Sequence, residues 1–238
     1  MHSTIPKTIH YCWFGNGEKP KLAKKCIESW KTYCPDYFFI EWNEKNFDIS
    51  KYQYTRYCYK EKKWAFLSDF VRLIVVYENG GIYLDTDVEI IKSLDELLTN
   101  DAFYGFENDE YVATGLGFGA QPNNSTVKAM IEEYNKLKTD KKGNYELINC
   151  PRLNTKALMD FGLVCNGKKQ SIRSAEIYPA EFFNPLNDAT GELLITENTY
   201  TINHYGKSWL NKGLKLKSKI SRPIHRLFGT GFFDLLKK

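Results

Sequence analysis

The sequence lacks the features that mark membrane-spanning, secreted and disulfide-rich proteins. No stretch approaches the 18 or so consecutive apolar residues of a membrane-spanning helix, and residues 1–10 have no basic segment followed by an apolar one, as a secretory signal would. The six cysteines contain no Cys-x-x-Cys pair and no spacing typical of a metal finger. A chain of 238 residues can bury a core without disulfides, so we expect reduced cysteines.

The net positive charge of the chain comes from its C-terminal end. The chain has a formal net charge of +4, yet residues 210–238 contain eight basic residues and one acidic residue, or +7, so the other 209 residues carry −3. We therefore expect one domain over residues 1–209, a basic tail over 210–238, and no nucleic-acid partner. The aromatic content of 15% is high, and aromatic side chains serve both protein cores and sugar-binding clefts.

Hydrophobic periodicity predicts a βαβ unit at the start of the chain. Apolar residues alternate over 5–14, a Gly-Asn-Gly turn follows, and residues 20–33 have helical spacing. The run over 37–42 then predicts a second strand. A strand, a helix and a strand in this order favour parallel pairing.

The middle of the chain predicts a helix, a tight turn and a buried strand in direct succession. Apolar residues follow helical spacing over 64–77, Asn79-Gly80-Gly81 supplies a stop, and residues 82–84 form a short strand. A further helix is expected over 125–137, and short strands and turns over 150–205.

Two carboxylates stand where the strand over 82–84 ends. Asp85 and Asp87 would point to opposite faces of a continuing strand, but a turn at its exit lets both converge on a cation. Ligands of open α/β sheets bind at the carboxyl ends of the strands, where Mg²⁺ or Mn²⁺ could offset the charge of a diphosphate. On the preceding helix, the three-residue spacing of Asp69 and Arg72 fits either a surface ion pair or a ligand-binding pair.

This run closely resembles the sugar-binding region of glycosyltransferase family 32. The matching residues are Ser68-Asp69-x-x-Arg72 and Gly80-Gly81-Ile82-Tyr83-Leu84-Asp85-Thr86-Asp87, with an opening Ile5-Pro6-Lys7-x-Ile9-His10-x-x-Trp13-x-Gly15 and Ser29-Trp30. It is also similar to the glucosyltransferase domain of the large clostridial cytotoxins. The resemblance implies an α/β fold of the GT-A type, with a Rossmann-like mixed sheet flanked by helices, and a hexosyltransferase that uses a divalent metal and retains anomeric configuration.

The resemblance also assigns roles to individual residues. It places Trp13 at the base of the nucleotide, makes Asp85 and Asp87 the metal-binding residues of catalysis, and places a set of donor-binding side chains around the ribose, sugar and diphosphate: Ser68, Asp69, Arg72, Tyr83, Ser208 and Trp209. Related retaining enzymes use a histidine in a similar closing motif as a third metal ligand, which points to His204. In that comparison Lys207 resembles a phosphate-binding lysine, although Ser208 follows it where the related motif has proline.

Some alternatives stay open on the sequence alone. Glu107, Asp109 and Glu110 are acids that could serve as a nucleophile, and no pattern selects one of them. The glycine-rich segment over 113–119 lacks the dinucleotide-binding pattern, so it lines the acceptor side of the cleft or forms a tight turn.

The function expected is transfer of a hexose from a nucleotide-diphosphate sugar, with a UDP-sugar favoured, to a saccharide acceptor in bacterial surface or capsular polysaccharide synthesis. Apolar and basic residues alternate over 214–236, which favours an anionic membrane surface as a partner, a lipid-linked acceptor and a peripheral location on the inner face of the cell membrane. Two other functions are an aspartyl-nucleophile phosphatase with Asp85 as nucleophile, and a non-catalytic sugar-nucleotide binding module. Two features count against the phosphatase. Position 89 is Glu, where that superfamily has Thr or Val, and the sequence has no downstream Gly-Asp-x-x-x-Asp to bind a metal.

Overall fold

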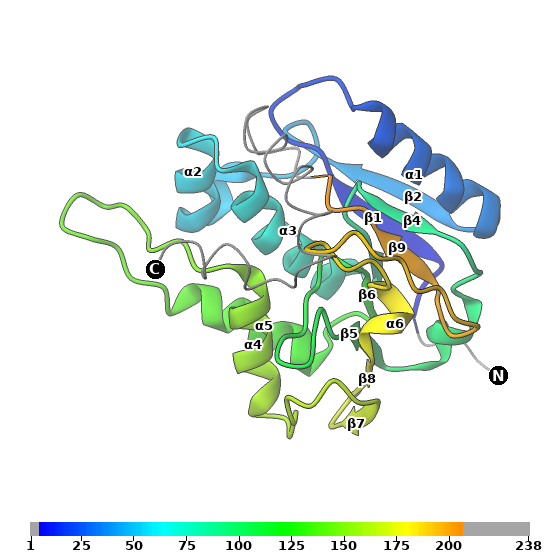
Figure 1. Cartoon of the computed structure of the whole chain (residues 1–238). Coiled ribbons are helices and arrows are strands. Elements are labelled where there is room, and N and C mark those ends of the chain that lie inside the picture. Colours follow the sequence, from blue (N-terminus) through cyan, green and yellow to red (C-terminus); the bar gives the residue numbers. More distant parts are fainter. Residues whose placement is uncertain (1–4, 207–238) are drawn as a thin grey trace, which may run out of the picture.

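The computed structural model describes residues 5–206, drawn in colour in Figure 1. Its helices are α1 (Lys21–Tyr33), α2 (Gln53–Lys60), α3 (Trp64–Asn79), α4 (Ser125–Asn135), α5 (Cys150–Met159) and α6 (Ala180–Phe183), with short 3-10 helices at Ile49–Lys51 and Asp95–Thr99. Its strands are β1 (Thr8–Cys12), β2 (Phe38–Trp42), β3 (Gly81–Tyr83), β4 (Val88–Ile90), β5 (Ala102–Gly105), β6 (Phe118–Ala120), β7 (Gln170–Ile172), β8 (Ala175–Tyr178) and β9 (Thr201–Asn203).

A seven-stranded mixed sheet forms the centre of the fold, in the order β2-β1-β3-β6-β5-β8-β7. The pairs β1–β2, β1–β3 and β5–β8 are parallel, whereas β3–β6, β5–β6 and β7–β8 are antiparallel. A separate antiparallel pair joins β4 to β9. The predicted parallel βαβ unit is confirmed, since β1 and β2 pair in parallel around α1.

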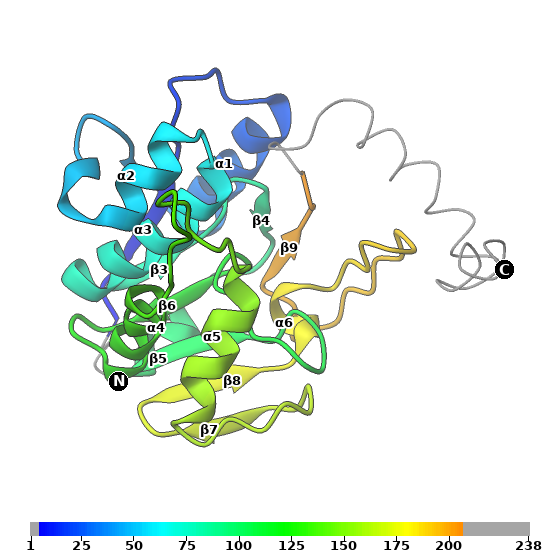
Figure 2. The same cartoon turned by 90° about the vertical axis from the view of Figure 1, so that its left-hand side faces the viewer.

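Hydrophobic side chains cover both faces of the sheet. Along β3, Tyr83 joins the apolar cluster shared with α2, α3, α4 and α5, while Ile82 joins the cluster shared with α1, β4 and α6. This alternation follows the two-residue period of a strand. Figures 1 and 2 show α2 to α5 gathered on one side of the sheet and α1, β4, β9 and α6 on the other. The predicted α/β class, a mixed sheet flanked by helices, is confirmed.

The turn between α3 and β3 sets the position of the two aspartates that follow β3. Gly80 ends α3 with φ at 66°, a left-handed conformation that glycine adopts without strain, and Gly81 follows with φ at 100°. A side chain at Gly81 would lie 2.7 Å from the carbonyl oxygen of Thr8 and 2.9 Å from the ring of His10. The two glycines therefore let the buried helix turn directly into the sheet beside β1.

The prediction of only strands and turns over 150–205 is wrong, because Cys150–Met159 forms α5. Its buried face includes Asn154 and Thr155 beside Leu153 and Leu158, so polar residues interrupt the apolar pattern that marks a helix. The other predicted helices and strands are present with small shifts at their ends.

Two simpler expectations can be compared directly. All six cysteines are free, as expected from their spacing. Within residues 5–206, none of the helices combines the length and apolar character that a membrane span requires. The predicted domain boundary at 209/210 and the basic tail lie outside the described residues.

Candidate active site

The chain turns sharply where β3 ends, and this turn carries both aspartates. The Leu84 amide donates to the His10 carbonyl at 3.1 Å, which extends the pairing with β1 by one residue. The Asp85 amide then donates to the Gly115 carbonyl at 3.3 Å, and the Val88 amide closes back onto the Asp85 carbonyl at 3.0 Å. Asp85 and Asp87 thus leave the sheet within one turn, as the spacing predicts.

Arg72 of α3 lies between two carboxylates. Its Nη2 is 2.9 Å from Asp69 Oδ1 and 2.9 Å from Asp85 Oδ1. The Arg72 side chain is only 3% exposed, and its guanidinium lies over the Tyr83 ring at 4.9 Å from the centroid. Tyr83 in turn donates its hydroxyl hydrogen to Asp85 Oδ1 at 3.0 Å. The structure therefore brings together four of the predicted residues in one polar cluster.

In this cluster, burial and the charge of Arg72 have opposing effects on the pKa values of the two aspartates. Burial raises the pKa of Asp85, the Arg72 guanidinium opposes that rise, and the negative charges of Asp87 and Asp69 add to it. Burial likewise raises the pKa of Asp69, again opposed by Arg72. Two partly buried acids with a single buried cation leave negative potential in the cluster, which favours a ligand that brings hydrogen-bond donors or positive charge.

Arg72 also has partners that lie far away along the chain. Its Nη1 contacts Thr114 Oγ1 at 3.5 Å and Cys150 Sγ at 3.7 Å, and Asn154 Nδ2 donates to the same threonine at 3.0 Å. Arg72 Nε and Asn154 Oδ1 are nevertheless buried without a hydrogen-bond partner among the described residues. These unpaired groups are polar positions that a bound ligand could use.

Asp87 lies beside the end of β9. Its Oδ2 accepts a hydrogen bond from the Gly206 amide at 2.8 Å, and its carbonyl accepts one from the His204 amide at 2.9 Å. The β4–β9 pairing causes this approach across more than 100 residues. The segment that follows β9 therefore contacts Asp87 through the backbone amides of His204 and Gly206.

The His204 ring does not join the aspartates. Its Nε2 lies 2.6 Å from Glu89 Oε2, and Lys25 Nζ lies 2.8 Å from the same oxygen. Within residues 5–206, no three His, Cys, Asp or Glu side chains are grouped as a metal site. The structure therefore does not group Asp85, Asp87 and His204, because the His204 ring pairs with Glu89 instead.

The acids nevertheless suit a cation that is held partly by its substrate. Magnesium is usually bound through one or two carboxylates with phosphate and water oxygens, rather than by a full protein cage. Asp87 has one side-chain hydrogen bond in the described structure, to the Gly206 amide, so it retains coordinating capacity. Asp85 Oδ1 already accepts from both Arg72 and Tyr83. Asp87 is thus the better placed of the two to hold the ion.

The remaining predicted residues are less directly connected to this cluster. Trp13 is half-buried, its Nε1 donates to the Gly17 carbonyl at 2.6 Å, and Lys19 Nζ lies 5.6 Å from its ring. Ser68 donates its hydroxyl to the Trp64 carbonyl, one turn back in α3. Lys207, Ser208 and Trp209 lie outside the described residues.

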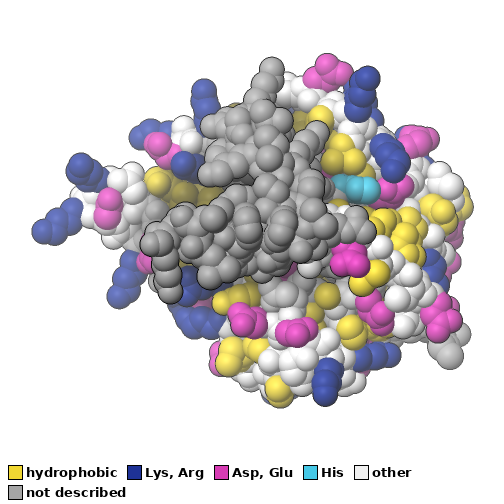
Figure 3. Space-filling view, viewed as in Figure 1, with side chains coloured by type: hydrophobic (Ala, Val, Ile, Leu, Met, Phe, Trp, Pro, Cys, Tyr) yellow, Lys and Arg dark blue, Asp and Glu magenta, His cyan; other side chains and the backbone are white. Residues whose placement is uncertain are grey.

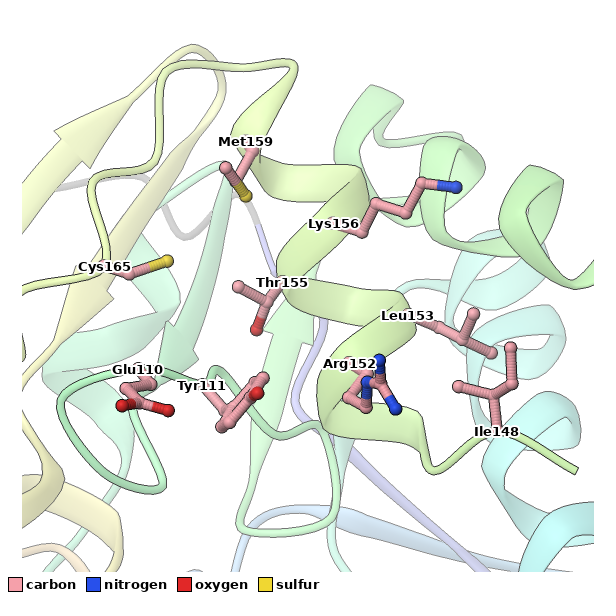
Figure 4. A pocket seen from close by; sticks show the side chains of 9 residues that line it. All are labelled: Glu110, Tyr111, Ile148, Arg152, Leu153, Thr155, Lys156, Met159 and Cys165. Atoms are coloured by element: carbon pink, nitrogen blue, oxygen red, sulfur yellow. The ribbon is translucent and has the colours of Figure 1, made fainter.

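A cavity of about 450 Å³ lies on another face of α5, away from both aspartates. Figure 4 shows Thr155 of α5 on the side of Tyr111 and Cys165, whereas Lys156 projects from the other side of the helix. On the same helix, Cys150 and Asn154 face the Arg72 cluster instead. The cavity therefore lies across α5 from the acids and is not part of their site.

A segment in the first half of the chain matches a known family. Residues 20–104 match the model described as "Glycosyltransferase sugar-binding region containing DXD motif". The chain carries a sugar-binding region of the glycosyltransferase family 32 type. This confirms the resemblance read from the helix, the glycine turn and the aspartates.

Two curated relatives share this region. Inositol phosphoceramide mannosyltransferase 3 of Schizosaccharomyces pombe is 35% identical over 107 residues, which span 40% of this chain and 28% of the relative. Inositol phosphoceramide mannosyltransferase 1 of the same yeast is 28% identical over 128 residues, spanning 46% and 39%. The chain thus aligns with well under half the length of either relative.

Two solved structures are similar over a larger share of the chain. "PaToxG Glycosyltransferase" covers 66% of this chain and 68% of its own, with a TM-score of 0.49 and 20% identity. A glycosyltransferase involved in glycosylation of the major capsid of PBCV-1 covers 84% and 95%, with a TM-score of 0.48 and 11% identity.

Several residues of the site were missed from sequence. Thr114, Cys150, Asn154, Asn184 and Tyr205 lie around the sugar-binding region but outside residues 20–104. No motif marks Cys150, Asn154 or Asn184, whereas Thr114 lies in the glycine-rich segment and Tyr205 follows His204 in the closing motif. The contacts of all five residues appear only in the fold. In the glycine-rich segment, which was expected to line the acceptor side of the cleft or to form a tight turn, Gly115 packs directly against Asp85 and Arg72.

Proposed function

We propose that the chain is the catalytic domain of a divalent-metal-dependent, retaining glycosyltransferase that moves a hexose from a nucleotide-diphosphate sugar to a saccharide acceptor. The observation that carries this proposal is the Asp69–Arg72–Asp85 cluster beside Asp87, at a strand exit within a region that matches the sugar-binding family model. An acidic cluster with one buried arginine suits a polar, hydroxyl-rich ligand next to a charged diphosphate.

Each side chain has a separate task in this proposal. Arg72 holds Asp69 and Asp85 in position, and their remaining lone pairs accept hydroxyl groups of the donor. The buried Arg72 Nε–H, unpaired among the described residues, is available to a donor oxygen. Asp87, assisted by Asp85, would hold Mg²⁺ or Mn²⁺, which when bound supplies positive charge that offsets the charge of the departing diphosphate.

A phosphatase is a poorer fit to the same residues. In that alternative Asp85 would attack phosphorus, yet Arg72 and Tyr83 both donate to its Oδ1, and Arg72 also reaches Oδ2 at 3.3 Å. These hydrogen bonds stabilise the carboxylate and lower its nucleophilicity.

The donor and acceptor are proposed by chemical class. A UDP-sugar is favoured, and the names of the two yeast relatives make a mannose donor the next to test. The acceptor would be a saccharide, either free or lipid-linked, of a bacterial surface or capsular polysaccharide.

The +7 tail would hold the enzyme on the anionic inner face of the cell membrane, close to a lipid-linked acceptor. The described residues 5–206 contribute none of this positive charge, since they contain 24 basic and 28 acidic residues. Figure 3 shows the two signs interspersed on the described part of one face.

A donor screen tests the proposal. The full chain is incubated with UDP-glucose, UDP-galactose, UDP-N-acetylhexosamines and GDP-mannose, with Mn²⁺, with Mg²⁺ and with EDTA, and release of nucleotide diphosphate is measured. We expect one donor to be hydrolysed only in the presence of metal. A generic phosphate ester serves as the control substrate. Hydrolysis of that ester without nucleotide release from any sugar would contradict the proposal.

A further inference from the structure

The Asn184 side chain, which has no role in the proposal so far, joins the backbone of Glu107 to the side chain of Tyr205. Glu107 follows β5, Asn184 ends α6, and Tyr205 follows β9. Asn184 Nδ2 donates to the Glu107 carbonyl oxygen at 3.0 Å and to the Tyr205 hydroxyl at 2.7 Å. One amide group therefore joins two loops that lie far apart in the sequence.

These contacts fix the orientation of the Asn184 amide. A carbonyl oxygen can only accept, so the amide nitrogen must face Glu107 and the amide oxygen must face the other way. Asn184 is only 9% exposed, and its Oδ1 is buried without a hydrogen-bond partner among the described residues. Unpaired buried polar atoms are rare in folded proteins, and a hydroxyl donor from a ligand would satisfy this one.

The Glu107 carboxylate is a second acceptor in the same place. Its side chain is half-buried and has no hydrogen bond or ion pair within residues 5–206. Its charge acts on Cys150, next to Arg72, and also on Tyr205. The carboxylate is therefore within electrostatic range of both Cys150 and Tyr205.

Tyr205 supplies a donor and is held in an unusual conformation. Its φ of 49° is left-handed, which is uncommon for a residue with a bulky side chain and is found preferentially at functional sites. Because Asn184 donates to its hydroxyl oxygen, the hydroxyl hydrogen is free to point elsewhere. The next residue, Gly206, binds Asp87 through its amide, so the ring is tied to the aspartate turn.

We propose that Glu107, Asn184 and Tyr205 form the subsite for the acceptor sugar. Neighbouring sugar hydroxyls both donate and accept, so they can donate to the Glu107 carboxylate and Asn184 Oδ1 while accepting from the Tyr205 hydroxyl. The inference rests on the proposed transferase function, since it places the acceptor beside the donor cluster. It assigns substrate binding to residues outside the matched region 20–104.

Binding of simple sugars tests the subsite independently of turnover. Saturation-transfer NMR is recorded for methyl α-D-glucoside, galactoside and mannoside with the full chain. Each sample contains a nucleotide diphosphate and Mg²⁺, and no Mn²⁺. We expect at least one glycoside to bind. Glu107→Gln and Tyr205→Phe should weaken that binding about tenfold, the loss expected for one hydrogen bond in a polar site. Both variants should keep the Kd for the nucleotide diphosphate.

A matched control comes from the same loop. Glu110→Gln removes an exposed carboxylate three residues along the chain, and it should leave glycoside binding unchanged. If no glycoside binds the unsubstituted protein, or if Glu107→Gln and Tyr205→Phe bind it as well as that protein does, the subsite is wrong. A parallel loss of nucleotide affinity in these variants would also overturn it, because the cluster would then serve the donor or the fold. Failure of the donor screen alone would instead reject the transferase function.

Discussion

Arg72 is the buried charge that makes the acidic cluster possible. Without it, Asp69 and Asp85 would face each other with no compensating cation in a largely buried setting. The neighbouring Gly115 permits this packing, because any side chain there would overlap Asp85 and come within 3.0 Å of Arg72 Nη1. A glycine in the loop before β6 thus decides how closely the ion cluster can pack.

Replacement of Arg72 tests whether the cluster is also structural. We expect Arg72→Met to lower the free energy of unfolding by about 3 kcal/mol, because it leaves two acids without their cation. Arg72→Lys should lose less, since it keeps the charge but not the planar guanidinium. Urea denaturation at neutral pH measures both changes. A methionine variant as stable as the original chain would show that the cluster contributes nothing to folding.

Asp87 differs from Arg72 because its structural role is small. Its side chain accepts one hydrogen bond, from Gly206, so Asp87→Ala should cost only about 1 kcal/mol of stability. Metal-dependent release of nucleotide diphosphate should fall by about 10³-fold or more, since the cation loses its main ligand. The exposed Asp160→Ala is the control and should remain fully active. Full activity in Asp87→Ala would contradict the assigned role.

At the scale of elements, His10 joins three parts of the fold. Trp42 of β2 donates its indole hydrogen to His10 Nδ1 at 3.0 Å, so Nδ1 is an acceptor and Nε2 carries the hydrogen. His10 Nε2 then donates to the Gly80 carbonyl at 2.8 Å, at the end of α3. The buried imidazole is neutral with both nitrogens paired, and it ties β1 and β2 to the α3–β3 turn.

This arrangement predicts a pH dependence of stability. Burial lowers the pKa of His10 below its ordinary value of 6.5. As the pH falls below about 6.5, the unfolded chain binds a proton that the folded chain excludes, so stability falls through that window. Above about pH 6.5, His10 no longer makes the stability depend on pH, because it is neutral in both the folded and the unfolded chain.

Comparison with a variant isolates the contribution of His10. The stability advantage of the original chain over His10→Asn should shrink by up to about 1.4 kcal/mol per pH unit below pH 6.5. Urea denaturation at several pH values between 5 and 8 measures the difference. A constant difference across this range would mean that the folded state protonates His10 as readily as the unfolded state does.

At the scale of the whole molecule, the net positive charge is concentrated in residues 210–238, whereas residues 1–209 carry −3. We expect the full chain to co-sediment with vesicles that contain anionic lipid, because each basic residue near such a surface contributes about 1 kcal/mol. A chain lacking residues 213–238 should stay in the supernatant. Circular dichroism should show that its fold is intact. Binding of the full chain should weaken as salt is raised. Equal sedimentation of the two chains would refute the role of the tail.

Local patterns in the sequence determined the elements and the donor side of the site. The helix over 64–79, the two glycines and the aspartates are consecutive, so helical periodicity, a glycine stop and a strand exit could be recognised one after another. The same holds for the parallel pairing of β1 and β2 around α1. These features depend on interactions between residues that are near neighbours in the chain.

Only the tertiary structure decided which distant side chains complete the site. Asn184 meets Glu107 across 77 positions and Gly206 meets Asp87 across 119, while His204 turns to Glu89 instead of the aspartates. Such contacts follow from the order of strands in the sheet and from the β4–β9 pairing. Hydrophobic burial drives these pairings without direction, so a single sequence records that segments are buried but not which of them meet.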